Sequence, residues 1–212
     1  MSYDFEFFQS AVRSFESEKR FKHTLGVQDE AYKLGTIFLP EKAEKLKLAG
    51  LLHDITKDFS LEQQLELCRR HGIPYDERNI VPKLLHAKTG AEHAKSTFGD
   101  EIIDKEIYNG IFYHTTGCAG MTLFDAIIYL ADYIEEGRTF EDCILLRRYF
   151  YENLEKSKTN EEALEVLRKT MVMSFDLTIK NLIDEGKQID FDTVKARNYF
   201  LVNNYSVFLM EE

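Results

Sequence analysis

Proline and cysteine are scarce in this sequence of 212 residues, and tryptophan is absent. With only 3 Pro and 11 Gly, the sequence is unlike that of a disordered or linker-rich chain. The three cysteines, Cys68, Cys118 and Cys143, are odd in number and form no Cys-x-x-Cys pair, so we expect free thiols in a reducing compartment. No apolar run approaches the ~20 residues that a membrane span requires.

An excess of positive charge is also missing. The formal net charge of −10 argues against nucleic acid as a partner, because phosphate backbones bind basic surfaces. A small phosphorylated substrate stays compatible with this charge if a metal ion and a few Lys or Arg reverse the field locally. The first residues carry neither a basic segment nor a long apolar one. We therefore expect no signal peptide, no membrane partner and a cytoplasmic location.

Several well-known site motifs are absent from the sequence as well. It contains no Gly-x-x-x-x-Gly-Lys phosphate loop, no Gly-x-Gly-x-x-Gly, no His-Glu-x-x-His and no Gly-x-Ser-x-Gly. Nucleotide binding through a glycine-rich loop and hydrolysis by an elbow serine are therefore not expected.

Helix-forming residues dominate what is present. Hydrophobic residues make up 44% of the chain, including 16 Phe and 11 Tyr, so a large core can form. Ser60 and Thr122 each begin a capping box, and Asp104 is a third N-cap candidate. We predict an all-α protein and, since no linker or repeat is found, a single domain over residues 1–212. The predicted helices cover residues 4–15, 17–38, a central helix ending in the stretch 48–57, 60–71, 84–99, 105–113, 123–136, 140–153, 160–185 and 192–203.

The central stretch ends in two polar residues, His53 and Asp54, directly after an apolar run. Buried polar groups must be paired or bind something, and imidazole with carboxylate suits Fe, Mn, Co or Zn. Similar polar residues interrupt other apolar helical stretches, about one helix-and-loop unit apart. Together these four histidines and two aspartates are His23, His53, Asp54, His86, His114 and Asp132. A helical bundle can gather them around a metal ion. Of the other histidines, we expect His71 to cap a helix end and His93 to be exposed.

The order His23, His53-Asp54, Asp132 resembles that of the HD-domain metal-dependent phosphohydrolases. Longer strings are similar to the bacterial YqeK family over about residues 17–140. These strings are Arg20-Phe-Lys-His23-Thr-Leu-Gly-Val, Ala49-Gly-Leu-Leu-His53-Asp54-Ile-Thr-Lys57, His86-Ala-Lys-Thr-Gly90-Ala91, His114-Thr115-Thr-Gly117 and Ile128-Tyr-Leu-Ala-Asp132-Tyr-Ile-Glu135-Glu-Gly-Arg138. The resemblance implies an HD helical bundle over residues 17–140, with helices of 141–212 packed on it. It also implies symmetrical hydrolysis of diadenosine tetraphosphate to two ADP, with iron as the metal and Mn or Co as substitutes.

The same resemblance assigns roles to individual residues. It makes the metal ligands His23, His53, Asp54 and Asp132. His86 and His114 either hold a second metal ion, with Asp54 bridging, or face the substrate phosphates. We expect Asp54 to orient the attacking water and Lys57 to contact a phosphate, if the helix continues from His53 as far as Lys57. The remaining phosphate contacts are assigned to Arg20, Thr115 and Arg138.

Three alternatives stay open at this point. The same ligand order occurs in HD-type di-iron oxygenases, although the cations Arg20, Lys57 and Arg138 argue against a substrate without phosphate. A phosphatase of another nucleotide would use the same site, and a non-catalytic nucleotide sensor is the third alternative. Aromatic residues in the segments 5–8 and 199–205 suggest a homodimer, but core packing explains them equally well.

Overall fold

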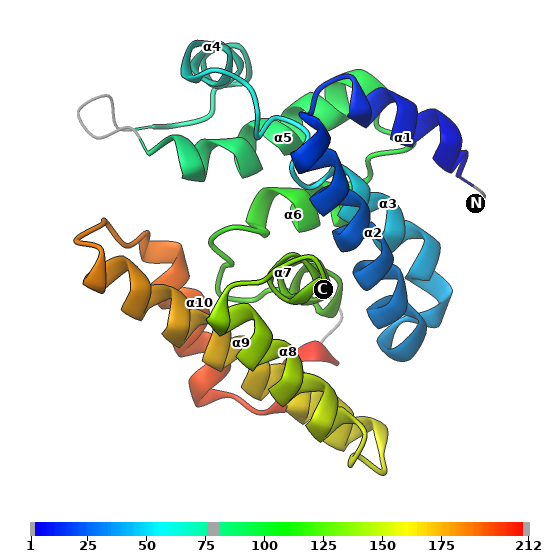
Figure 1. The fold of residues 1–212 in the computed structure, drawn as a ribbon, viewed down its shortest axis with the longest axis vertical. Coiled ribbons are helices and arrows are strands. Elements are labelled where there is room, and N and C mark those ends of the chain that lie inside the picture. The colour runs from blue at the N-terminus through cyan, green and yellow to red at the C-terminus, as the bar shows by residue number, and fades with distance from the viewer. Residues whose placement is uncertain (1–2, 76–80, 210–212) are drawn as a thin grey trace.

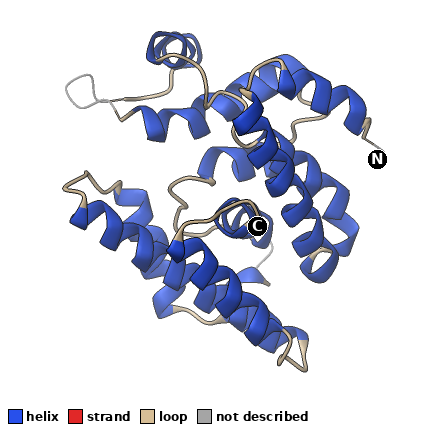
Figure 2. Cartoon of the chain, viewed as in Figure 1, coloured by secondary structure: helices blue, strands red, loops and turns tan. Residues whose placement is uncertain are grey.

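The computed structural model describes residues 3–75 and 81–209, which form helices joined by turns (Figure 1, Figure 2). The prediction of an all-α fold is confirmed, because no strand occurs among these residues. None of their helices is both long and apolar enough to cross a lipid bilayer. In chain order the α-helices are α1 (Phe5–Arg13), α2 (Glu18–Phe38), α3 (Ala43–Leu52), α4 (Leu61–His71), α5 (Pro82–Phe98), α6 (Lys105–Tyr113), α7 (Leu123–Ile134), α8 (Glu141–Leu154), α9 (Asn160–Asp184) and α10 (Phe191–Val202).

The helices begin where the capping residues predicted them to begin. The Ser60 hydroxyl accepts a hydrogen bond from the Gln63 backbone N–H at 3.2 Å, and the Gln63 side chain accepts one from the Ser60 N–H at 2.8 Å. Thr122 and Asp125 form the same reciprocal pair at the start of α7. Asp104 caps α6. These bonds satisfy backbone donors that have no partner within the helix, so a short sequence motif determines where each helix starts.

Helix α3 lies in the core, as its apolar run predicts. Leu46, Leu48 and Leu51 are fully buried. Gly50 lets α3 approach α2 closely, because a Cβ at this position would lie 3.0 Å from the Val27 carbonyl oxygen. The close contact of α2 with α3 brings the last turn of α3 beside the N-terminal half of α2, where polar residues of both helices meet.

The C-terminal helices α8, α9 and α10 lie on one side of α7 (Figure 1). Phe175 of α9 packs on Tyr129 of α7 with ring centroids 4.7 Å apart, and it stacks on Phe200 of α10 at 6.2 Å. One apolar core includes buried residues of α1–α3 and α5–α10, and a second, small cluster joins Cys68 of α4 to Leu85 of α5. We propose from this continuity that the chain is the single domain predicted, with the helices of residues 141–212 supporting the part that carries the histidines.

Candidate metal centre

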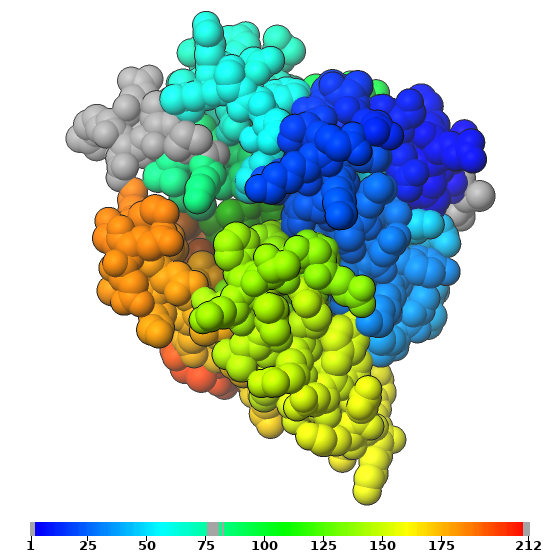
Figure 3. Space-filling model, in the orientation of Figure 1, coloured from blue at the N-terminus to red at the C-terminus, as the bar shows by residue number. Residues whose placement is uncertain are grey.

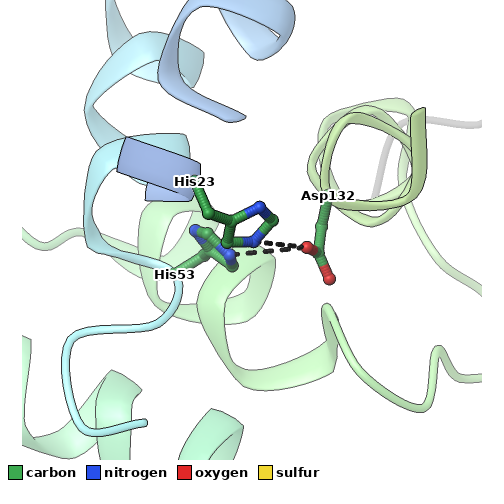
Figure 4. A group of neighbouring side chains, drawn as sticks. All are labelled: His23, His53 and Asp132. Atoms are coloured by element: carbon green, nitrogen blue, oxygen red, sulfur yellow. Dashed lines mark ion pairs between the residues drawn. The ribbon is translucent and has the colours of Figure 1, made fainter. Parts of the chain in front are cut away.

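Two histidines and an aspartate from three helices meet beside the end of α3 (Figure 4). His23 belongs to α2, His53 directly follows α3, and Asp132 belongs to α7. Nε2 of His23 lies 3.0 Å from Oδ1 of Asp132, and Nε2 of His53 lies 3.6 Å from the same oxygen. One donor atom from each residue lies within 4.8 Å of the other two, which suits a single metal ion.

Asp54 extends this group toward two further histidines. Its Oδ2 lies 3.5 Å from Nε2 of His53, while its Oδ1 lies 3.1 Å from Nε2 of His86 and 3.4 Å from Nε2 of His114. Burial alone would raise the pKa of Asp54, but the neighbouring histidines hold it well below the ordinary value. Asp54 is therefore a carboxylate, and all six predicted ligand residues lie in one cluster.

The rings of His53 and His114 are oriented by the same kind of local hydrogen bond. Each residue follows the last residue of a helix, and its Nδ1 lies 2.7 Å from the carbonyl oxygen three residues earlier. Since a carbonyl only accepts, Nδ1 must carry the hydrogen. Nε2 of each ring is thereby turned into the cluster, where it can bind a metal or a substrate.

Cationic side chains surround the cluster on its more open side. Arg20 donates to Oδ2 of Asp54 at 2.8 Å, and Arg138 forms an ion pair with Asp132. The side chains of Arg20, Lys57 and Arg138 are 28%, 27% and 28% exposed, whereas those of His53, Asp54 and His86 are almost inaccessible. The surface is hollowed between the segment near residue 185 and the start of α5 (Figure 3). Three partly exposed cations thus lie next to the buried histidines, two of them paired with carboxylates of the cluster.

Lys57 lies beside His86, but it does not reach this position through a helix that continues from His53. Helix α3 ends at Leu52, and the chain continues in tight turns, with the Lys57 N–H bonded to the Asp54 carbonyl at 2.7 Å. These turns still bring Nζ of Lys57 to 2.9 Å from Nε2 of His86. Burial lowers the pKa of Lys57, although Asp54 and Asp132 oppose this effect. Burial also lowers the pKa of His86 to about 4, so its ring is neutral at pH 7. Oγ1 of Thr115 lies 3.1 Å from Nε2 of both His86 and His114.

Three buried atoms of the cluster lack a hydrogen-bond partner among the described residues. Nε2 of His23, Nε2 of His53 and Oδ1 of Asp54 are buried and make no hydrogen bond within the described part of the chain. Buried polar atoms without partners are costly, and the two histidine nitrogens lie near the same oxygen of Asp132, so a common partner would satisfy both. Imidazole nitrogens with carboxylate oxygens are the donors that divalent transition metals prefer. The residues present therefore fit such an ion.

Two predictions for histidines outside the cluster differ from the structure. His93 is not exposed: its ring packs between Phe15 and Phe59, with centroid distances of 5.0 and 5.2 Å. Its polar neighbours in the sequence suggested solvent, but the aromatic residues that cover it come from distant segments. Nδ1 of His71 lies 3.3 Å from Glu92, so it joins α4 to α5 in addition to ending a helix.

Sequence reasoning gave no role to two residues that contact the site. Oε1 of Glu135 lies 3.0 Å from Nδ1 of His23. Burial would raise the pKa of Glu135, but hydrogen bonds from His23 and the Gly137 backbone lower it. Arg147 of α8 donates to carbonyl oxygens of the loop that follows α7. A carboxylate three residues after Asp132 was a signal for Glu135, whereas nothing in the sequence identified Arg147.

Comparisons of this chain with a family model and with known proteins agree with one another. The family model of the HD domain matches residues 20–137. A Bacillus subtilis protein named symmetrical bis(5'-nucleosyl)-tetraphosphatase is 31% identical over 163 residues, which are 77% of this chain and 83% of that protein. A Staphylococcus aureus protein of the same name is 31% identical over 191 residues, 89% of each chain.

A solved structure agrees with the sequence comparison. A Clostridium acetobutylicum protein described as a predicted HD superfamily hydrolase involved in NAD metabolism superposes with a TM-score of 0.79 at 36% identity, over 95% of this chain and 99% of that one. The HD model spans more than half of the sequence, and these relatives are covered over most of their length. The chain therefore belongs to the HD-domain family, whose members bind divalent metal ions.

Proposed function

We propose that this protein is a metal-dependent hydrolase that cleaves diadenosine tetraphosphate symmetrically to two ADP. The observation that carries the proposal is a buried cluster of histidines and carboxylates with cations on its open side. The relatives named symmetrical bis(5'-nucleosyl)-tetraphosphatase support this substrate. Although the whole chain has a net charge of −10, Arg20, Lys57 and Arg138 make the entrance locally positive. A polyphosphate chain suits that entrance.

The metal ligands in this proposal are His23, His53, Asp54 and Asp132. A bound divalent ion, which we propose to be iron with Mn or Co as substitutes, lowers the pKa of water and neutralises phosphoryl charge. Asp54 stays ionised because its pKa is depressed, so it can accept a hydrogen bond from the attacking water and orient it.

A single metal ion is favoured by the position of Lys57. Its ammonium lies 2.9 Å from Nε2 of His86 and 3.6 Å from Oδ1 of Asp54, on the side where a second ion would use these same atoms. A cation already held there makes a second one electrostatically unfavourable. We therefore propose that His86, His114 and Thr115 face the substrate phosphates rather than bind metal, with the Thr115 hydroxyl donating a hydrogen bond to a phosphate oxygen.

The basic residues act on the phosphate chain of the substrate. Arg20 and Arg138 present planar guanidinium groups beside two different carboxylates of the cluster, Asp54 and Asp132 respectively. Guanidinium binds phosphate oxygens with two parallel hydrogen bonds, so this pair can hold the chain in one register. With Lys57 between them, the central phosphates would lie over the cluster. A fixed register explains cleavage at the middle of the chain.

Product analysis tests this function. Iron-loaded protein is incubated with diadenosine tetraphosphate, and its products are compared with those of a His53→Ala, Asp54→Ala variant. His93→Ala is the matched control, because His93 lies outside the cluster. ADP as the sole product, lost only in the double variant, is expected. AMP with ATP, or undiminished activity of the double variant, would contradict the proposal. Absence of turnover together with two bound irons and oxygen uptake would favour a di-iron oxygenase.

A further inference from the structure

We propose that Glu135 is a positioning residue that fixes the His23 imidazole for the metal ion. Oε1 of Glu135 lies 3.0 Å from Nδ1 of His23, and the Glu135 side chain is 4% exposed. His53 and His114 have backbone carbonyls in the corresponding position. For His23, in the interior of α2, the partner is a side chain 112 residues away. The inference depends on the metal site of the proposed function but not on its substrate.

The contact determines which ring nitrogen of His23 can bind the metal. A carboxylate only accepts hydrogen bonds, so Nδ1 of His23 carries the hydrogen. Nε2, which lies on the side of Asp132, is then the nitrogen left to bind a metal ion. A carboxylate behind a metal-binding imidazole also raises the basicity of the opposite nitrogen. Glu135 therefore gives His23 both its orientation and part of its strength as a ligand.

Two glycines leave room for the Glu135 carboxylate. Gly26 lies one turn after His23 on α2, and a Cβ there would overlap with Oε2 of Glu135. A Cβ at Gly137 would lie 2.8 Å from the same oxygen, and the Gly137 N–H donates to it at 2.5 Å. Glycine in a helix interior is unfavourable compared with alanine. Its presence at position 26 is explained by the carboxylate that occupies the space.

The loop that carries Glu135 is held by the C-terminal helices. Arg147 of α8 donates to the carbonyl oxygens of Ile134 at 2.6 Å and Arg138 at 2.8 Å, and also to that of Glu135. Glu135 directly follows α7, three residues after Asp132. One short segment therefore carries both a proposed metal ligand and the hydrogen-bond partner of another proposed ligand, His23. A helix outside the match to the HD model thus fixes the position of Glu135 relative to His23.

Cobalt binding to metal-stripped protein tests the proposal without any substrate. Glu135→Ala should weaken Co²⁺ about 10–100-fold and alter its visible absorption spectrum, the usual range for loss of a partner behind a ligand. Glu135→Gln should lose less Co²⁺ affinity than Glu135→Ala, because the amide oxygen can still accept a hydrogen bond from Nδ1 of His23. Glu136→Gln is the matched control, since Glu136 is the exposed neighbour. Equal Co²⁺ affinity and equal spectra for folded Glu135→Ala, Glu135→Gln and wild-type proteins would overturn the proposal.

A double-variant cycle tests the glycine pocket separately. Gly26→Ala should weaken Co²⁺ binding in the wild-type protein because the new methyl group displaces the carboxylate. In the Glu135→Ala protein the displaced group is gone, so adding Gly26→Ala should cause no further loss of affinity. Strictly additive losses would mean that Gly26 serves only helix packing. Failure of diadenosine tetraphosphate hydrolysis with normal Co²⁺ results would count against the substrate alone.

Discussion

Glu16 is a buried acid next to the site. Its titration should make the free energy of unfolding depend on pH near neutrality. Its Oε1 accepts a hydrogen bond from Thr24 at 3.1 Å, while Oε2 is buried and makes no hydrogen bond within the described segments. Burial, opposed mainly by that hydrogen bond, raises the pKa of Glu16 from 4.5 to about 8, and the neighbouring charges of Asp54 and Arg20 act in opposite directions. Between pH 5 and 8 the folded protein therefore keeps a proton that the unfolded chain releases.

This difference makes the free energy of unfolding decrease as the pH rises. Each pKa unit corresponds to about 1.4 kcal/mol, so a pKa of about 8 instead of 4.5 removes up to about 5 kcal/mol by pH 8. Glu16→Gln keeps the acceptor for Thr24 and has no proton to lose. Its stability should be closest to that of the wild-type protein at pH 5 and should exceed it by a growing margin up to about pH 8.

Urea unfolding from pH 5 to 8.5, with chelator present, measures this difference. The histidines of the metal centre titrate in both proteins, so subtracting one curve from the other removes their contribution. Glu18→Gln is the control, because Glu18 is exposed and its surface ion pair with Arg13 contributes little. Curves for Glu16→Gln and wild-type protein that run parallel over this pH range would refute the reasoning.

Three further predictions concern the metal and the residues around it. The wild-type protein should bind one ion per chain by metal analysis, and two ions per chain would contradict the single-metal proposal. In the same site, Lys57→Met should lower kcat/KM about 100-fold, as expected for the loss of a charge-assisted hydrogen bond to the substrate. Arg147→Met should destabilise the protein by about 2–4 kcal/mol in urea unfolding because buried carbonyls lose a donor, whereas exposed Arg148→Met should not. Chelation should lower the Tm of protein saturated at ~100 Kd by roughly 5–10 °C, and it should not shift that of His53→Ala.

The sequence predicted well those features that depend on neighbours along the chain. Ser60, Asp104 and Thr122 begin helices as expected, because a capping side chain bonds the backbone only two or three residues away. The buried apolar run of α3 was also evident. The orientation of His53 and His114 is equally local, and their position directly after a helix could have indicated it.

Features that depend on contacts between distant segments were not predictable. Glu135 meets His23 across 112 residues, and the aromatic rings around His93 come from two other segments. Lys57 reaches His86 through a series of turns and not through the helical spacing that was assumed. In each case the residue types are evident from the sequence, but the distance between them depends on how α2, α5 and α7 pack.

The charges of the site indicate how metal and substrate binding are coupled. Asp54 pairs with Arg20 and Asp132 pairs with Arg138, which compensates buried carboxylates that would otherwise be costly. If both carboxylates hold the ion, as we propose, they no longer need the arginines, and both guanidinium groups become available for phosphate. Each ligand should therefore strengthen the other reciprocally. Calorimetry should find ADP binding at least several-fold tighter with Co²⁺ present than without it. Equal ADP affinity in both states would mean that the arginines serve the carboxylates alone.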